Sequence, residues 1–214
     1  MIKAVLFDLD GTLADTAPDL GAALNRMRTA RGLDAVPLDE IRPCASHGAR
    51  GLLGLGFGVS PADDNYAALR DEFLDLYEHD LFNETQLFPG VVELLNTLET
   101  RGLLWGVVTN KAERFALPLL ELMALTDRAA CIIGGDTTGK TKPHPEPLLA
   151  ASRRIGVPSS DCVYVGDDRR DVDAALAAGM RSAVAKYGYL NGSDPLTWGA
   201  TWLISRPTDL LAHI

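Results

Sequence analysis

Short apolar runs recur along the chain and alternate with longer stretches in which apolar residues are spaced three or four apart. Runs of the first kind, bounded by polar residues or glycine, predict buried strands, and the wider spacing predicts amphipathic helices. The expected strands cover residues 3–7, 103–108, 129–133, 162–165, 182–185 and 201–204, and the expected helices include residues 91–98, 119–123, 148–155 and 172–176. Strands that alternate with helices predict an α/β fold with a doubly wound, Rossmann-like parallel sheet.

Residues 16–82 break this rhythm, because they contain no convincing strand pattern. A helix is expected from Thr16, whose spacing from Asp19 is typical of a capping box, to about residue 31. A second helix is expected over residues 62–79. We therefore expect two parts, an all-helical cap at residues 16–82 and an α/β core formed by residues 1–15 and 83–214.

The composition and net charge limit which kinds of molecule the protein is expected to bind. The 214 residues are 47% hydrophobic and carry a formal net charge of −9. This charge argues against a nucleic-acid partner or an anionic membrane, which would require clustered Lys and Arg. It does not exclude an anionic small molecule, because one metal ion or one Lys reverses the field locally.

Cysteine usage and hydropathy bear on location. Cys44, Cys131 and Cys162 are widely spaced and form no CxxC pair, which indicates reduced thiols in a cytoplasmic protein. No apolar stretch approaches the roughly 20 residues needed to cross a bilayer. The N-terminal apolar run is ended by Asp8 and Asp10, so it does not read as a signal peptide. A monomer and a homodimer both remain open.

Two acids follow the first expected strand directly. Because strand side chains alternate, Asp8 and Asp10 point to one face and Leu9 to the other. In open α/β sheets, ligands bind beyond the carboxyl ends of the strands, where these carboxylates are expected. Two neighbouring acids repel each other unless a cation joins them or one is protonated. A solvated, Asp-rich turn is the alternative interpretation of this pair taken alone.

Other strand ends carry matching chemistry. Thr109 and Asn110 follow the strand at residues 103–108, and a hydroxyl and an amide there suit phosphate oxygens. Lys142 precedes a proline, which favours an extended backbone, and its ammonium could neutralise a phosphate and a carboxylate. The strand at residues 162–165 is followed by three further acids suited to Mg²⁺, namely Asp167, Asp168 and Asp171. Singly, Thr109 is also compatible with an ordinary turn and Lys142 with a surface position.

In this order, the four motifs resemble the haloacid dehalogenase superfamily of phosphohydrolases. The matching segments are residues 8–12 (DLDGT), Thr109-Asn110, Lys142-Pro143 and residues 166–171 (GDDRRD), and the resemblance extends over essentially the whole chain, including the helical cap. It implies a Mg²⁺-dependent phosphatase that acts on a small phosphate ester through an aspartyl-phosphate on Asp8.

The resemblance also implies a role for each matched residue. Asp8 would be the nucleophile and Asp10 the general acid and base, while Thr109 and Lys142 would bind the transferring phosphoryl group. Mg²⁺ would be held by Asp8, the backbone carbonyl of Asp10 and Asp167, with support from Asp171 or Asp168. Substrate contacts are expected from Gly11, Thr12, Asn110 and Arg50.

Substrate specificity is expected to come from the cap, because the core motifs bind only the phosphate group and the metal ion. The candidate segment is residues 46–51 (SHGARG), in which Arg50 could pair with a carboxylate or phosphate; a solvent-facing Arg at a helix start is the alternative. Two groups of the superfamily look similar, the phosphoglycolate phosphatases and the N-acetylmuramic acid 6-phosphate phosphatases. Asp168 stands where typical phosphoglycolate phosphatases often carry Ser, and residues 187–189 (YGY) and 198–200 (WGA) resemble the second group.

Several other functions are compatible with parts of the pattern. Residues 134–141 (GGDTTGKT) match the phosphate-binding loop of nucleotide triphosphatases, but Pro143 and Pro145 oppose the helix that such a loop requires. A phosphoacceptor receiver module shares the acids, Thr and Lys, but it lacks a large helical insertion. Within the superfamily a sugar phosphomutase remains open, whereas Asp10 argues against a dehalogenase.

Overall fold

The computed structural model describes all 214 residues and contains a six-stranded parallel sheet in the order β5-β4-β1-β6-β7-β8. This arrangement confirms the predicted doubly wound α/β fold. The strands are β1 (Ala4–Phe7), β4 (Leu104–Val108), β5 (Ile132–Ile133), β6 (Cys162–Gly166), β7 (Arg181–Ala185) and β8 (Trp202–Ile204). The two central strands are β1 and its neighbour β6, so the residues that follow them reach the middle of one sheet edge.

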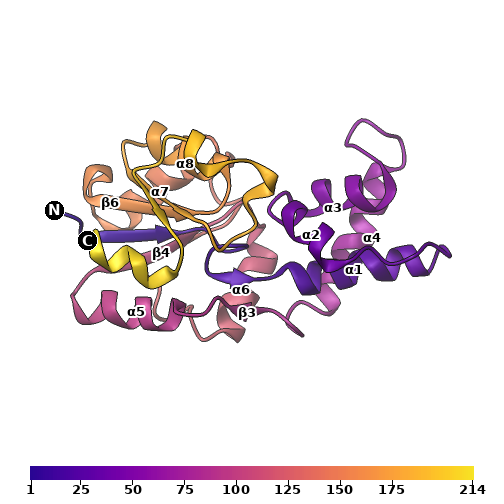
Figure 1. The fold of residues 1–214 in the computed structure, drawn as a ribbon, viewed down its shortest axis with the longest axis horizontal. Helices are drawn as coiled ribbons and strands as arrows, with labels where there is room; N and C mark the ends of the chain where they lie inside the picture. Colours follow the sequence, from indigo (N-terminus) through magenta and orange to yellow (C-terminus); the bar gives the residue numbers. More distant parts are fainter.

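Helices cover both faces of the sheet (Figure 1). One face packs against α5 (Val91–Thr100) and α6 (Glu113–Leu122), and the other against α7 (Glu146–Ile155) and α8 (Arg169–Ala177). The predicted apolar stripe of α5 is buried, and each fully buried Leu or Val in it contributes roughly 1.5–3 kcal/mol. The short 3₁₀ segments are η1 (Ser159–Asp161), η2 (Leu190–Gly192), η3 (Pro195–Thr197) and η4 (Pro207–Ala212). None of the helices has both the length and the apolar character that crossing a bilayer demands.

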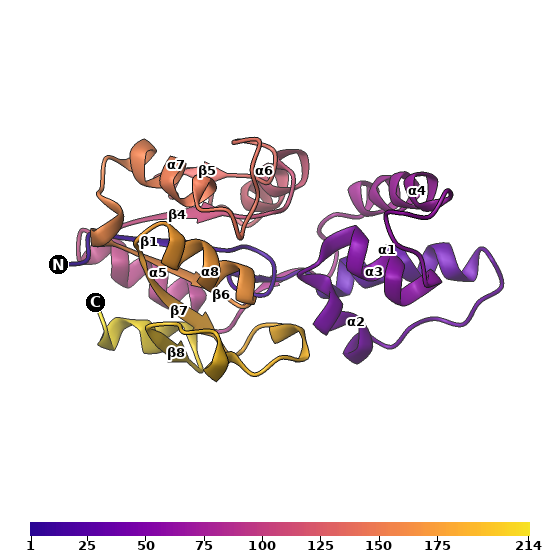
Figure 2. The same ribbon diagram turned by 90° about the horizontal axis from the view of Figure 1, so that it is seen from above.

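Four helices form a separate unit beside the sheet, at the end of the molecule opposite the two termini (Figures 1 and 2). They are α1 (Ala17–Thr29), α2 (Leu38–Ala45), α3 (Gly48–Phe57) and α4 (Tyr66–His79). This helical unit has its own apolar cluster, which includes Leu24, Leu52 and Phe73. Phe115 of α6 and Tyr189 belong to the same cluster, so the helical unit packs directly onto the rest of the chain.

The two segments that enter and leave the helical unit lie side by side. β2 (Ala14–Asp15) pairs antiparallel with β3 (Gln86–Leu87), a small sheet that the apolar pattern did not reveal. Asp19 accepts hydrogen bonds from the backbone N–H groups of residues 83, 84 and 85 at 2.9–3.2 Å.

The predicted capping box at the start of α1 is therefore wrong. Thr16 makes no side-chain capping bond, and its hydroxyl donates to Asp10 Oδ1 at 2.5 Å. The carboxylate of Asp19 does not reach back to the helix start, because the returning segment offers it a row of free N–H groups. A capping box does form at α8, between Asp168 and Asp171.

Candidate active site

Three buried carboxylates meet at the carboxyl edge of the sheet. Asp8 follows β1, Asp167 follows β6, and Asp171 lies in the first turn of α8. One carboxylate oxygen of each lies within 4.8 Å of the other two, and all three residues are at most 8% exposed. Asp167 is held on both oxygens, by the Thr12 hydroxyl at 3.1 Å and the Tyr189 N–H at 2.8 Å.

The crowding of these acids makes their charged forms costly. Burial, together with the charges of Asp171 and Asp10, raises the pKa of Asp8 to about 6, although Lys142 opposes the shift. Burial, together with the charges of Asp171 and Asp8, raises the pKa of Asp167 well above its ordinary value. A hard divalent cation with oxygen ligands removes this cost, so the donor set fits Mg²⁺.

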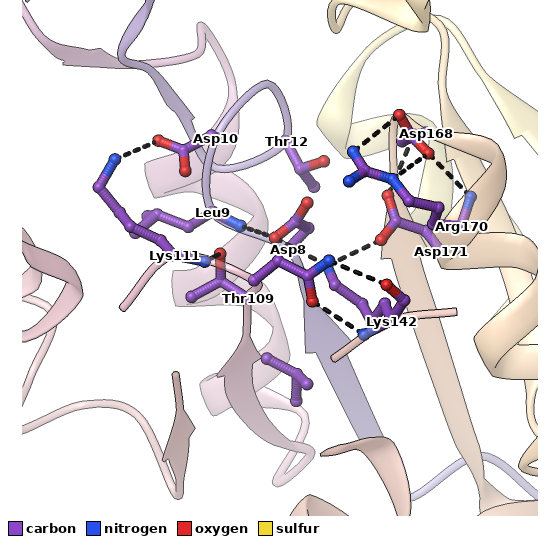
Figure 3. Close-up of polar contacts among 12 residues, drawn as sticks. Asp8, Leu9, Asp10, Thr12, Thr109, Lys111, Lys142, Asp168, Arg170 and Asp171 are labelled. Carbon is purple, nitrogen blue, oxygen red and sulfur yellow. Dashed lines mark hydrogen bonds and ion pairs between the residues drawn. The ribbon is translucent and has the colours of Figure 1, made fainter. Parts of the chain in front are cut away.

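Lys142 places its ammonium beside two of the three acids (Figure 3). Its Nζ lies 2.9 Å from Asp8 Oδ1 and 2.8 Å from Asp171 Oδ1. Burial alone would lower the pKa of Lys142, but the charges of these two carboxylates outweigh it and raise the pKa. Asn110 fixes the backbone of Lys142, because its amide group bonds the Lys142 N–H at 2.9 Å and C=O at 3.0 Å.

Asp10 and Thr109 lie on the other side of Asp8. The carboxylate of Asp10 points toward Lys111, and its Oδ1 accepts from Lys111 Nζ at 2.9 Å as well as from the Thr16 hydroxyl (Figure 3). Lys111 is almost fully buried, and its ammonium lies 4.6 Å from the ring centroid of Tyr77 on α4. Although burial lowers the pKa of Lys111, the charge of Asp10 outweighs it and raises that pKa. Thr109 is 2% exposed, and its hydroxyl accepts from the Lys111 N–H.

A cavity of about 290 Å³ separates these residues from the helical unit. Polar residues at or near the strand ends form the floor of the cavity, and most of its apolar wall comes from α1, α4 and α6. The floor contains Asp8, Asp10, Thr109, Asn110, Lys142 and Asp171. The wall includes the apolar side chains of Leu20, Phe73, Leu74 and Phe115 and the cations Lys111, Arg114 and Arg170.

Buried acids, a lysine and a hydroxyl at one sheet edge under a helical unit are the arrangement that the four motifs imply. Comparison with known protein families gives a match over residues 5–185 to the haloacid dehalogenase-like hydrolases. The chain belongs to this family.

Curated relatives of this hydrolase are phosphatases. This chain is 49% identical over 209 residues to a phosphoglycolate phosphatase of Xanthomonas campestris pv. campestris. The alignment covers 97% of this chain and 94% of the relative. The chain is 43% identical to an N-acetylmuramic acid 6-phosphate phosphatase of Pseudomonas putida, with 98% and 94% covered. A crystal structure of a predicted phosphoglycolate phosphatase from Haemophilus somnus 129PT has a TM-score of 0.86 at 26% identity, covering 99% of this chain and 97% of that one. The hydrolase is therefore a phosphatase.

The structure does not bring every expected site residue to the cavity of the phosphatase. Arg50 is exposed and lies outside the cavity lining. The carboxylate of Asp168 caps α8 and pairs with Arg170 at 2.8 and 3.0 Å, so it is not part of the three-acid group. Gly11 and Thr12 lie against Asp167 and do not line the cavity; a Cβ at Gly11 would stand 2.2 Å from Asp167 Oδ2.

Lys111, Arg170 and Tyr77 line the cavity with polar groups but were not among the expected site residues. Lys111 directly follows the Thr109-Asn110 motif, and Arg170 lies within residues 166–171, so both could have been selected by position. Arg170 donates to the backbone carbonyl of Ser46 at 2.7 Å and so joins the acidic loop to the helical unit. Tyr77 gave no signal beyond its place in the apolar stripe of α4, yet its buried hydroxyl has no hydrogen-bond partner.

Proposed function

We propose that this phosphatase is a Mg²⁺-dependent phosphomonoesterase that transfers the phosphoryl group of a small metabolite to Asp8 and then to water. The observation that carries the proposal is the group of Asp8, Asp167 and Asp171, with the Lys142 ammonium beside Asp8 and Asp171. A fourth carboxylate, that of Asp10, lies on the side of Asp8 that faces away from Asp167 and Asp171. The family relationship to curated phosphatases supports the same chemistry.

Asp8, Asp167, Asp171 and the backbone carbonyl of Asp10 would hold Mg²⁺. When bound, the ion supplies positive charge that offsets the repulsion between a carboxylate and a phosphate dianion. The remaining neutralisation comes from Lys142, whose ammonium already lies beside Asp8. The Thr109 hydroxyl and neighbouring backbone N–H groups bind the non-bridging oxygens of the phosphoryl group.

The two carboxylates that react each have one oxygen engaged by the protein. Oδ1 of Asp8 accepts from the Leu9 N–H and from Lys142, which leaves Oδ2 to form the bond to phosphorus. The ester P–O bond breaks, and its electron pair goes to the leaving oxygen. Oδ1 of Asp10 accepts from Lys111 and Thr16, which leaves Oδ2 to give the leaving oxygen a proton.

Water then attacks the aspartyl-phosphate, and Asp10 takes the proton that this water loses. Free phosphate leaves and the carboxylate of Asp8 is restored. Splitting hydrolysis in this way replaces one difficult step with two easier ones. We propose residues 16–82 as the cap that closes over Asp8 and excludes water from the first step, with the paired linkers as its hinges.

Two substrates follow from the relatives and the cavity. The higher identity is to a phosphoglycolate phosphatase, and 2-phosphoglycolate is therefore our first candidate. The apolar wall favours a second candidate, N-acetylmuramic acid 6-phosphate, because a two-carbon acid leaves side chains such as Phe73 and Phe115 uncovered whereas a sugar ring covers them. Both candidates carry a carboxylate, for which Lys111 and Arg114 are suitable partners.

The test is phosphate release from a panel of esters headed by these two, with Mg²⁺ and with a chelator in its place. We expect Mg²⁺-dependent release with one strong preference, together with a phosphorylated peptide containing Asp8 after rapid acid quench. Asp8→Asn should abolish both signals, whereas the exposed control Lys140→Met should change neither. Release that persists in Asp8→Asn would refute the nucleophile, and activity seen only with added sugar bisphosphate would favour the phosphomutase.

The nucleotide triphosphatase alternative has no support in the structure. Lys140 and Thr141 lie in a loop, and the next helix, α7, begins only at Glu146. The phosphate-binding loop of those enzymes requires a helix that starts at the corresponding residues. Residues 134–141 are instead the loop that brings Lys142 to the site.

A further inference from the structure

Tyr164 lies under the Lys142 ammonium, and neither the motifs nor the comparisons give it a role. It is in β6, three residues before Asp167, and it is fully buried. Its hydroxyl oxygen accepts from Lys142 Nζ at 2.7 Å and its proton goes to the backbone carbonyl of Val108 at 2.6 Å. The side chain thus reaches from β6 past the central strand β1 to the end of β4.

Hydrogen bonds fix the orientation of the Lys142 ammonium. An ammonium has three N–H donors. Its three acceptors are Asp8 Oδ1 at 2.9 Å, Asp171 Oδ1 at 2.8 Å and the Tyr164 hydroxyl at 2.7 Å. Because the single Tyr164 proton is committed to the Val108 carbonyl, the hydroxyl can only accept from Lys142.

We propose that Tyr164 is a positioning residue for phosphoryl transfer. Its hydroxyl holds the Lys142 ammonium in place relative to both Asp8 and the strand end that carries Thr109. Val108 directly precedes Thr109, so one hydroxyl links the ammonium to the β4 segment that binds phosphoryl oxygens. A fixed charge stabilises a transition state better than one that must first reorient. This proposal rests on the proposed function of the same site.

Tyr164→Phe isolates the hydroxyl. The phenylalanine ring keeps the packing and the contact of the ammonium with the ring, whose centroid is 5.3 Å from Nζ. The variant loses only the third acceptor of Lys142 and the donor to Val108. We expect kcat to fall about 10- to 100-fold, the scale on which misplaced catalytic groups act. KM should change much less, because the substrate's own contacts remain.

Tyr187→Phe is the matched control. The Tyr187 hydroxyl also donates to a backbone carbonyl, that of Thr12 at 3.1 Å, but it touches no ammonium. Both variants should lower the melting temperature, and only Tyr164→Phe should lower kcat strongly. In a Lys142→Ala background, Tyr164→Phe should cause no further loss, because the effect runs through Lys142. Equal losses in both backgrounds would assign Tyr164 a structural role, and a wild-type kcat would overturn the proposal.

A measurement without turnover separates this proposal from the proposed function. In protein labelled with ¹⁵N at the lysine Nζ, the ammonium of Lys142, identified by its absence in Lys142→Ala, should give a slowly exchanging signal. Tyr164→Phe should broaden or shift this signal, and Tyr187→Phe should leave it unchanged. If the wild type released phosphate from no ester, the function would fail while this spectrum still decided the role of Tyr164. An identical Lys142 signal in Tyr164→Phe would refute the positioning.

Discussion

Without a bound cation, the protein should lose stability as the pH rises through about 6, and Asp8→Asn should prevent much of that loss. Burial next to Asp171 and Asp10 moves the pKa of Asp8 from 3.8 to about 6. At about 1.4 kcal/mol per pKa unit, the shift corresponds to about 3 kcal/mol between the protonated and the charged carboxyl. Asp8 is only 8% exposed, so solvent screens little of this energy.

The sign follows from which state holds the proton more tightly. The folded chain has the higher pKa at Asp8, so the proton stabilises the folded state. This contribution is complete below about pH 4, where both states are protonated, and it is lost as the pH rises through about 6. The amide of Asp8→Asn resembles the protonated carboxyl and carries no such dependence. At pH 8, the metal-free variant should therefore be more stable than the wild type by up to about 3 kcal/mol.

Urea unfolding in the presence of a chelator measures this difference directly. The gap between Asp8→Asn and wild type should be largest at pH 8 and should shrink toward pH 5, with roughly 2–4 °C in melting temperature for each kcal/mol. Asp173→Asn on α8, whose carboxylate is 44% exposed, is the control and should show no such gap. Adding Mg²⁺ at pH 8 should stabilise the wild type more than the variant. A variant that is equally destabilised at both pH values would refute the reasoning.

Three further substitutions test other contacts of the site. Asp10→Asn should lower kcat for an alkyl phosphate by about 10²- to 10⁴-fold in steady-state assays, and a melting temperature that still rises with Mg²⁺ would show that the metal site survives. Lys111→Met should raise KM for 2-phosphoglycolate more than for p-nitrophenyl phosphate, which has no carboxylate; equal increases would argue against a carboxylate contact. Tyr189→Phe removes a hydroxyl that accepts from the Thr16 and Ala17 N–H groups at 2.9 Å, and urea unfolding should show a loss of about 1–3 kcal/mol. Unchanged stability would mean that this bond does not hold α1 to the core.

The sheet and the grouping of the acids could be predicted because both depend on local pattern. Apolar runs separated by helical spacing determine a parallel sheet, and parallel strands bring their carboxyl ends to one edge. Asp8 and Asp167 follow two such runs, so their proximity follows once β1 and β6 are neighbours. The stripe of α5 was equally local, because burial of one helix face needs no knowledge of the partner.

Contacts that depend on the rotation or docking of an element could not be predicted in this way. Arg50 lies in α3, and whether it faces the cavity depends on how that helix sits on its neighbours; the structure leaves it exposed. Asp19 follows the local rule for a capping box, yet its partners are N–H groups more than 60 residues away. The pairing of Lys111 with Asp10 likewise joins two loops whose approach is set by the packing of β4 against β1.

Tyr164 stands between these two cases. Nothing in the local pattern distinguishes Tyr164 from the apolar residues around it. A tyrosine in a buried strand is normally interpreted as a core residue that packs against its neighbours. Once the register is known, however, Tyr164 is opposite Leu6, and alternation along β1 places Leu6 and Asp8 on the same face. A buried hydroxyl on that face, on the strand next to the one that carries Asp8, needs both a hydrogen-bond donor and an acceptor within the core. Lys142 and the Val108 carbonyl are the groups that satisfy it, so the position of the Lys142 ammonium depends on strand register as much as on the motif that supplies the lysine.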